Sequence, residues 1–173
     1  FGDFKKIFAR NKYGRVILRQ KENVYFIQRH EGGVPPHKIN YLAYIQALAD
    51  NDVKRIISVN SVGSLKKSVE TGKLLLPDDF ISLWNIPTFY DKLIRHIRPE
   101  ISTELRGLLA KKCRALKIDF YGQGVYFQTG GPRLETPAEI KMLADFGDVV
   151  GMTLGSEITL ANEKASRSRR SAR

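Results

Sequence analysis

Short runs of β-branched and aromatic residues alternate along this chain with stretches of helical periodicity, and this alternation limits the folds open to it. Runs of the first kind are typical of strands. The helical stretches space apolar residues three and four apart, as in residues 38–49, so that one apolar face can pack on a sheet. The pattern predicts an α/β fold. The strand-like runs are 16–18, 24–28, 55–59, 73–76, 124–128 and 149–151.

Two further helices are predicted from the same pattern. Apolar residues recur at helical spacing through residues 101–116. A third helix is expected to begin after Thr136, whose side chain can cap the first backbone N–H groups while Glu139 reaches back and Pro137 takes the first helical position. Because strands such as 55–59 are followed by long connections that include helices, we expect a mainly parallel or mixed sheet covered on both faces.

Length and composition are those of a folded domain. The chain has 173 residues with 42% hydrophobic content, which is enough for one domain with a core. Its one cysteine, Cys113, excludes an intrachain disulfide and a cysteine-rich zinc site. No stretch approaches the ~20 apolar residues that span a bilayer, and residues 1–14 lack the order of a secretory signal. We therefore expect a soluble, cytoplasmic protein with no membrane partner.

The formal net charge of +11 is concentrated at one end of the chain. The last ten residues, KASRSRRSAR, carry five basic residues and no acidic one, which leaves +6 for the rest. The other basic residues are scattered rather than interleaved with aromatics in a stripe, so a solvated surface is favoured over a nucleic-acid face. A basic nucleic-acid-binding module remains the alternative. We expect a domain over residues 1–163 and a disordered tail over 164–173.

Polar residues follow four of the predicted strands. In open α/β sheets, ligands bind at the carboxyl ends of strands. A guanidinium grips phosphate with two parallel N–H bonds, and imidazole, hydroxyl and backbone N–H groups can complete the cradle. Each pair alone would also suit an ordinary polar loop, but together they predict a phosphate site. The residues are Arg29 and His30, Asn60 and Ser61, the segment 129–135, and Met152 and Thr153.

Other kinds of site lack the spacing that they need. His30 and His37 are too far apart for an i, i+4 zinc pair and no HExxH motif is present, so we expect no metal. The glycines at 122 and 124 precede a predicted strand and lack a third glycine. The sequence contains neither a P-loop nor a G-x-S-x-G elbow.

At these residues the chain resembles the purine nucleoside phosphorylase superfamily, in particular the branch that acts on 5'-methylthioadenosine and 5'-methylthioinosine. The sequence segments that carry this resemblance are specific to that family in their order and combination. The segments that carry the resemblance are RH at 29–30, PPHKINY at 35–41, VNSVGSL at 59–65, LLLPDDFI at 74–81, GPRLETPAEI at 131–140, and GMT with a following SE at 151–157.

The resemblance implies a three-layer α/β/α domain with a mixed, largely parallel sheet, assembled as a homo-oligomer, usually a trimer. It implies phosphorolysis, in which a purine nucleoside and inorganic phosphate, the co-substrate, give free purine and ribose 1-phosphate without another cofactor. Arg29, His30 and Glu135 would be the catalytic residues. Phosphate would bind to Arg29, His30, Asn60, Ser61 and Thr153, and the nucleoside to Leu134, Glu135 and Met152, with Met152 packed on the sugar.

Glu135 falls where the family reads the base. A carboxylate there can accept from the N1–H of a 6-oxopurine, whereas adenine has only a lone pair at N1, so inosine-like or guanosine-like substrates are favoured. The alternative is that Glu135 serves the dipole of the helix after Thr136, which favours a negative charge by ~0.3–1 kcal/mol.

The family also has segments that have no counterpart here. It begins with a strand and a glycine-rich phosphate loop, and it continues beyond the position of Glu163 through strands that carry an Asp or Asn for purine N7. The chain therefore looks truncated at both ends, with exposed sheet edges and apolar surface. An inactive fragment with only the architecture of the family is a further alternative.

Overall fold

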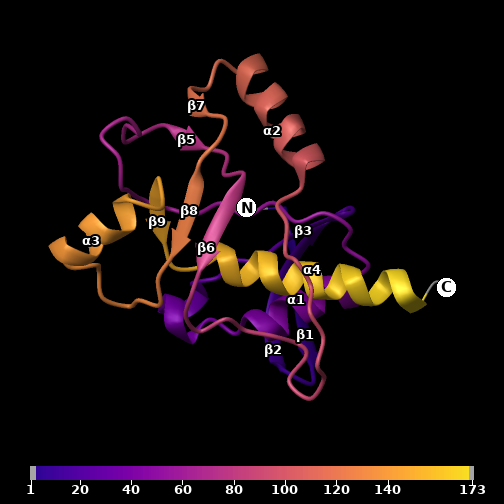
Figure 1. Ribbon diagram of the computed structural model, residues 1–173. Coiled ribbons are helices and arrows are strands. Elements are labelled where there is room, and N and C mark those ends of the chain that lie inside the picture. Colours follow the sequence, from indigo (N-terminus) through magenta and orange to yellow (C-terminus); the bar gives the residue numbers. More distant parts are fainter. Residues whose placement is uncertain (1–2, 172–173) are drawn as a thin grey trace.

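The computed structural model describes residues 3–171, which form three sheets and four α-helices (Figure 1). The strands are β1 (Lys5–Asn11), β2 (Gly14–Lys21), β3 (Val24–Phe26), β4 (Gly63–Ser64), β5 (Leu74–Leu75), β6 (Asp79–Ser82), β7 (Phe120–Tyr121), β8 (Val125–Gln128) and β9 (Val149–Gly151). The α-helices are α1 (Tyr41–Asp50), α2 (Thr103–Ala115), α3 (Pro137–Ala144) and α4 (Leu154–Ser171), and two 3-10 turns span Glu31–Gly33 and Pro36–Lys38.

The central sheet is mixed and largely parallel, as predicted. Its strand order is β4-β9-β8-β6. Strands β6, β8 and β9 run parallel, and the short β4 is antiparallel to β9. Strand β8 lies between two parallel neighbours and is the most buried of the four, with Tyr126 and Phe127 almost fully covered. The β8 and β9 ends that carry candidate residues therefore lie side by side.

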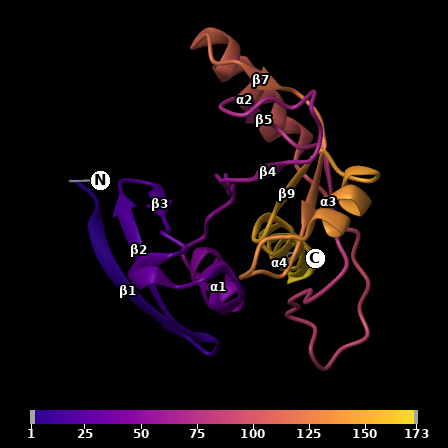
Figure 2. The same ribbon diagram turned by 90° about the vertical axis from the view of Figure 1, so that its left-hand side faces the viewer.

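Alternate residues of β8 face the two helices that cover this sheet. Phe127 packs against Leu143 of α3, whereas Gln128 donates to Ser156 of α4 from the other face at 2.8 Å. Successive side chains of a strand point to opposite faces, so α3 and α4 form the outer layers. Figure 2 shows α3 and α4 on either side of β8 and β9. The fold is thus the three-layer α/β/α arrangement expected from the sequence.

The first three strands form a separate antiparallel sheet, order β1-β2-β3, which packs on α1. Helix α1 in turn packs on α4, so this sheet lies on the far side of α4 from the central sheet (Figure 2). Leu18 and Leu160 are fully buried between these elements, and burial of each side chain contributes roughly 1.5–3 kcal/mol. The parallel pair β5-β7 forms the remaining small sheet beside α2.

The predicted start of α3 is confirmed in detail. The Thr136 side chain accepts from the backbone N–H of Glu139 at 3.2 Å, and the Glu139 carboxylate accepts from the backbone N–H of Thr136 at 2.7 Å. Pro137 occupies the first helical position, where its missing N–H leaves no bond unmade. This capping box fixes the loop that carries Glu135 against the end of β8.

Two predicted segments have a different structure. Residues 55–59 form no strand, because within residues 3–171 no neighbouring strand pairs with them, and Ile57 and Val59 are 59% and 78% exposed. β-branched composition favours extended backbone, but a strand also needs a partner. Residues 164–171 continue α4, where we expected a disordered tail over 164–173, and residues 172–173 lie outside the described residues. Alanine, lysine and arginine propagate a helix that packing has already nucleated, and basic residues suit its C-terminal end.

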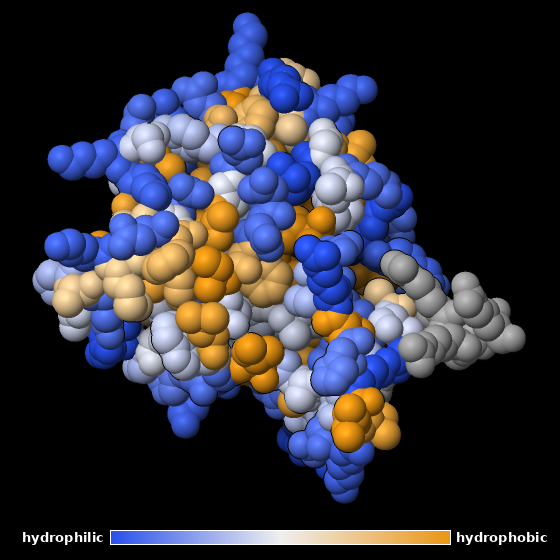
Figure 3. Space-filling model, in the orientation of Figure 1, coloured by the Kyte–Doolittle hydropathy of each residue, from blue (hydrophilic) through white to orange (hydrophobic). Residues whose placement is uncertain are grey.

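The surface combines charged and apolar side chains. Figure 3 shows an apolar area in the middle of the viewed face, interrupted by hydrophilic residues. Beyond β6, the side chains of Leu83, Trp84 and Ile86 are 61%, 51% and 52% exposed. None of the helices in residues 3–171 has the length and apolar character needed to cross a bilayer.

Candidate active site

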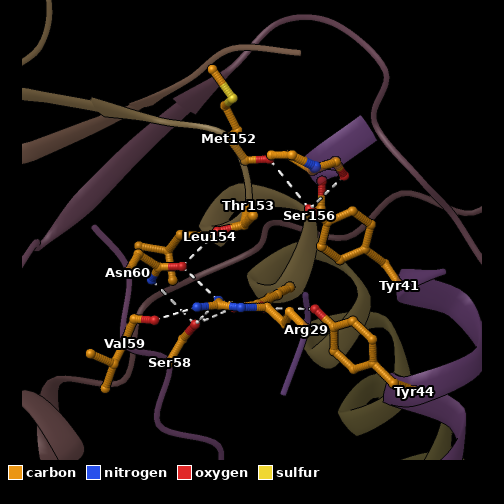
Figure 4. Close-up of polar contacts among 12 residues, drawn as sticks. Arg29, Tyr41, Tyr44, Ser58, Val59, Asn60, Met152, Thr153, Leu154 and Ser156 are labelled. Carbon is orange, nitrogen blue, oxygen red and sulfur yellow. Dashed lines mark hydrogen bonds and ion pairs between the residues drawn. The ribbon is translucent and has the colours of Figure 1, made fainter. Parts of the chain in front are cut away.

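The guanidinium of Arg29 is the centre of a cluster of polar side chains (Figure 4). Its Nη1 donates to Ser58 Oγ at 2.9 Å, to Asn60 Oδ1 at 2.6 Å and to Glu157 Oε1 at 2.9 Å. Its Nη2 donates to the carbonyl oxygen of Val59. The Arg29 side chain is 16% exposed, so the charge is mostly desolvated but still reaches the surface.

Glu157 supplies the negative charge behind Arg29. It lies in the first turn of α4 with only 6% of its surface exposed, and its carboxylate also accepts from Tyr44 Oη at 2.6 Å and from Ser58 Oγ. Burial, together with the neighbouring carboxylate, raises the pKa of Tyr44 well above its usual value. Tyr44 therefore stays protonated and remains a donor, which keeps the Arg29–Glu157 pair fully hydrogen bonded.

Thr153 brings the end of β9 into the same cluster. Its hydroxyl donates to Asn60 Oδ1 at 2.6 Å, and its backbone N–H donates to Tyr126 Oη at 3.1 Å. Gly151 makes this approach possible, because a Cβ at that position would lie 2.6 Å from Tyr126 Oη. Helix α4 begins directly after Thr153, at Leu154. The backbone N–H groups of Leu154 and Ser156 already donate to Tyr126 Oη and Gln128 Oε1, so the start of α4 favours an anion through its dipole.

Three of the five predicted phosphate residues therefore lie together: Arg29, Asn60 and Thr153. The structure thus brings together residues from three separate segments, although these do not all follow strands of one sheet, and phosphate binding by them stays a prediction. Arg29 follows β3 of the N-terminal sheet, and Asn60 follows an unpaired extended segment. What joins them is the start of α4: Glu157 of the helix bonds to Arg29 and Ser58, and Thr153, the residue before the helix, bonds to Asn60.

His30 and Ser61 lie beside the cluster rather than in it. The His30 ring places Nδ1 2.7 Å from the Val34 carbonyl oxygen, at the start of a 3-10 turn, and the residue is exposed. Ser61 is exposed in the loop before β4. Among the contacts of the described residues, no hydrogen bond joins His30 or Ser61 to Arg29, Asn60 or Thr153. Each is nevertheless the chain neighbour of a cluster residue.

The candidate nucleoside residues lie on the β8–α3 loop and at the end of β9. Glu135 accepts from Thr129 Oγ1 at 2.6 Å, which ties it to the end of β8, whereas Leu134 is 78% exposed. Met152 lies against the same loop, because a Cβ at Gly131 would be 2.5 Å from its sulfur, and Gly131 has a φ of +58° that also favours glycine. The loop with Glu135 and the residue before Thr153 are therefore in contact.

The carboxylate that caps the N-terminus of α3 is Glu139 rather than Glu135. Arg133 donates to both carboxylate oxygens of Glu139 at 2.7 and 2.8 Å. These bonds, together with those from Thr136, lower the pKa of Glu139 to about 2. Glu135 instead pairs with Thr129, outside the capping box. The position of Glu135 is thus set by the end of β8.

Sequence reasoning missed three members of the cluster. Ser58 lay within a predicted strand, Tyr44 lay among the apolar positions of a predicted helix, and Glu157 belonged to the SE pair to which no role was given. The signal available was the acidic residue four positions after Thr153, since the first turn of a helix is a favourable place for a carboxylate. Within residues 3–171 no group of three or more His, Cys, Asp or Glu side chains could hold a metal ion.

The structure is thus a three-layer α/β/α domain in which donors of Arg29 and Thr153, from separate segments, meet at Asn60 beside the start of α4. Residues 5–166 match the family model of the phosphorylase superfamily, and the chain belongs to that superfamily.

Its curated relatives are named as nucleoside phosphorylases. The chain is 42% identical over 144 residues to the probable 6-oxopurine nucleoside phosphorylase of Archaeoglobus fulgidus, with 82% of this chain and 59% of that protein covered. It is 42% identical over 175 residues to the probable S-methyl-5'-thioinosine phosphorylase of Methanocaldococcus jannaschii, with 94% and 67% covered. The chain therefore spans about three fifths to two thirds of the length of these relatives.

A solved structure confirms the fold. The methylthioadenosine phosphorylase of Schistosoma mansoni, in complex with tubercidin, superposes with a TM-score of 0.85 at 22% identity, over 92% of this chain and 70% of that one.

Proposed function

We propose that this chain forms part of a purine nucleoside phosphorylase, an enzyme that cleaves the N-glycosidic bond with inorganic phosphate to give free purine and ribose 1-phosphate. The observation that carries the proposal is that donors of Arg29 and Thr153, 124 residues apart in the sequence, meet at one acceptor beside the N-terminus of α4. A phosphate oxygen at that acceptor position accepts from both. The names of the curated relatives support the same reaction.

The mechanism follows from the charge that develops on the sugar. As the glycosidic bond breaks, the ring becomes positive, and a phosphate dianion held on one face stabilises that charge and attacks the anomeric carbon while the purine leaves from the other. The configuration at that carbon is inverted. Positioning both reactants can contribute ~7–11 kcal/mol. In this mechanism phosphate is the co-substrate, and no metal or other cofactor takes part.

Glu135 is proposed to select the base. Its carboxylate accepts from the N1–H that a 6-oxopurine has and adenine lacks. The name of the A. fulgidus relative supports this choice. Met152, whose backbone precedes Thr153 and whose side chain lies against the loop of Glu135, is proposed to pack on the sugar between the phosphate and the base.

Assembly as a homo-oligomer, a trimer by the family resemblance, is part of the proposal, as is a place in cytoplasmic purine salvage. The large apolar side chains of Leu83, Trp84 and Ile86 are each more than half exposed within four residues beyond β6, which supports self-association. His30 and Ser61 are proposed to reach phosphate from positions next to Arg29 and Asn60 in the chain.

The test is release of free purine from inosine with and without phosphate. Release is expected only when phosphate is present, and Arg29→Ala is expected to raise KM for phosphate far more than KM for inosine. Release without phosphate indicates a hydrolytic nucleosidase instead. Calorimetry with inorganic phosphate alone provides an independent measure, since a chain that keeps only the architecture of the family gives no saturable heat.

A further inference from the structure

Asn60 places one acceptor atom between donors from distant parts of the chain. Its Oδ1 accepts from Arg29 Nη1 and from Thr153 Oγ1, both at 2.6 Å (Figure 4). Because a guanidinium can only donate, the side-chain oxygen must face it. The amide nitrogen then points toward Ser58 Oγ, 3.3 Å away. Under the proposed function, the carboxamide oxygen competes with a phosphate oxygen for the same two donors.

The hydrogen bond from Arg29 to Asn60 is dispensable for Arg29. Nη1 has two hydrogens but faces three acceptors, which are Ser58 Oγ, Asn60 Oδ1 and Glu157 Oε1. When Asn60 turns away, the other two still satisfy Nη1, so the roughly 1–3 kcal/mol cost of an unpaired buried donor does not arise. Ser58 and Glu157 also hold the guanidinium in place while the exchange occurs.

We propose that Asn60 exchanges places with the phosphate oxygen and thereby sets the affinity of the site for phosphate. Its oxygen first holds Arg29 and Thr153 pointing at one position. Rotation about the Cα–Cβ bond then withdraws the carboxamide from that position, and rotation about the Cβ–Cγ bond turns the amide N–H₂ toward the bound anion, to which it donates. A carboxamide can accept from Arg29 and Thr153 in one orientation and donate to an anion in another, because its carbonyl oxygen is an acceptor and its amide nitrogen is a donor. This inference rests on the proposed phosphorolysis and adds how the phosphate site is held ready.

Two variants separate this role from a structural one. Asn60→Asp has the same shape and accepts from Arg29 and Thr153 more strongly, because the bonds are charge-assisted, but as a carboxylate it cannot donate to an anion. Asn60→Ala removes both functions. The exchange predicts that KM for phosphate rises about 100-fold in N60D and about tenfold in N60A, with KM for inosine changed less than about twofold in either.

Thermal unfolding provides the second measurement. N60D is expected to unfold at or above the wild-type temperature while it binds phosphate most weakly, since its carboxylate pairs with Arg29. N60A is expected to unfold below the wild type. A substitution at a purely structural residue would not keep or raise the melting temperature while it weakens phosphate binding most. If N60A fails to fold, Asn60→Ser takes its place, with a phosphate KM expected between those of the wild type and N60D.

The outcomes also separate this inference from the proposed function. If N60D binds phosphate at least as tightly as N60A does, Asn60 only supports the fold and the exchange is overturned. The same comparison applies to N60S where that variant is used. Phosphate-dependent cleavage by the wild type would still stand in that case. If the wild type neither cleaves inosine with phosphate nor gives saturable heat with inorganic phosphate, both the proposed function and the exchange are overturned. The order wild type, N60A, N60D in rising phosphate KM supports the exchange.

Discussion

Removing the charge of Glu157 is expected to destabilise the protein sharply. In Glu157→Gln the side chain keeps its shape, but the mostly buried Arg29 guanidinium loses its counter-ion, and the new amide group must face donors such as Tyr44 and Ser58. Breaking a buried ion pair by removing one partner costs about 3–5 kcal/mol. Because Arg29 retains 16% exposure, we take the lower end, about 3 kcal/mol.

The corresponding change in melting temperature can be estimated from chain length. For a domain of this size, 1 kcal/mol shifts Tm by roughly 2–4 °C, so E157Q is expected to melt about 6–12 °C below the wild type. Tyr44→Phe removes one hydrogen bond and leaves Glu157 paired with Arg29 and Ser58, which costs about 1 kcal/mol or roughly 2–4 °C. Circular dichroism melts of the three proteins test the ranking.

A second buried carboxylate on the same helix provides the matched control. Glu163 is 4% exposed and accepts from Thr88 Oγ1 at 2.7 Å and from the backbone N–H of Phe89 at 2.6 Å, remote from Arg29 in these contacts. Glu163→Gln is expected to lower Tm without altering the Tm gain on addition of phosphate. In E157Q that gain should exceed the wild-type gain, because the dianion then compensates a guanidinium without its own carboxylate. A melt of E157Q no lower than that of Y44F would refute the assignment of Glu157 as the counter-ion.

Three further changes have outcomes that the structure specifies. Gly151→Ala puts a Cβ 2.6 Å from Tyr126 Oη, so it should displace that hydroxyl from the Thr153 N–H. We expect it to lower the free energy of unfolding by about 1–3 kcal/mol and to raise KM for phosphate. Partial recovery in the double variant with Tyr126→Phe would support the steric cause, and no recovery would contradict it. Tyr44 has a raised pKa because it is buried beside Glu157, so the folded state retains a proton that the unfolded chain loses near pH 10. The free energy of unfolding should therefore be unaffected below that pH and fall as the pH rises above it. Denaturant melts of Y44F, which lacks the titrating group, should show a shallower fall. Glu135→Gln should reduce kcat/KM for inosine more than for adenosine, because a neutral amide no longer prefers the N1–H, and an equal loss for the two nucleosides would argue against base reading by this residue.

The predictable parts of the fold are those whose signal lies within a few residues. The Thr136 capping box is contained in four positions, and its two hydrogen bonds form as predicted. Strand β9 coincides with the run 149–151, because three consecutive apolar or small residues between turns suit a buried parallel strand. In contrast, residues 55–59 have strand composition without a partner, and the presence of a partner is a non-local property that composition does not contain.

Helix α4 was not predicted because most of its buried side chains are polar, although Leu160 is also fully buried. Hydrophobic periodicity detects a helix by its apolar stripe, yet Ser156, Glu157, Thr159 and Glu163 on this helix are all 9% exposed or less. These residues are buried because each hydrogen bonds to another group rather than because it avoids water. The side chain of Glu157 binds Arg29. The convergence of Arg29, Asn60 and Thr153 was predictable from the polar residues at the end of each segment, but the carboxylate that holds Arg29 was hidden by the same polar face.

The polar face of α4 also explains how the candidate site is ordered without a single continuous sheet beneath it. Its residues bond to four separate parts of the chain: Ser156 to the end of β8, Glu157 to the segments of Arg29 and Ser58, and Glu163 to the loop after β6. An apolar helix face would tolerate sliding of these segments, because hydrophobic contact is non-directional. Hydrogen bonds have preferred distances and angles, so a polar face sets the register of each segment against α4. The site residues contributed by those segments therefore depend on α4 for their relative positions, and substitutions on its buried face should alter ligand affinity in proportion to their contact with Arg29.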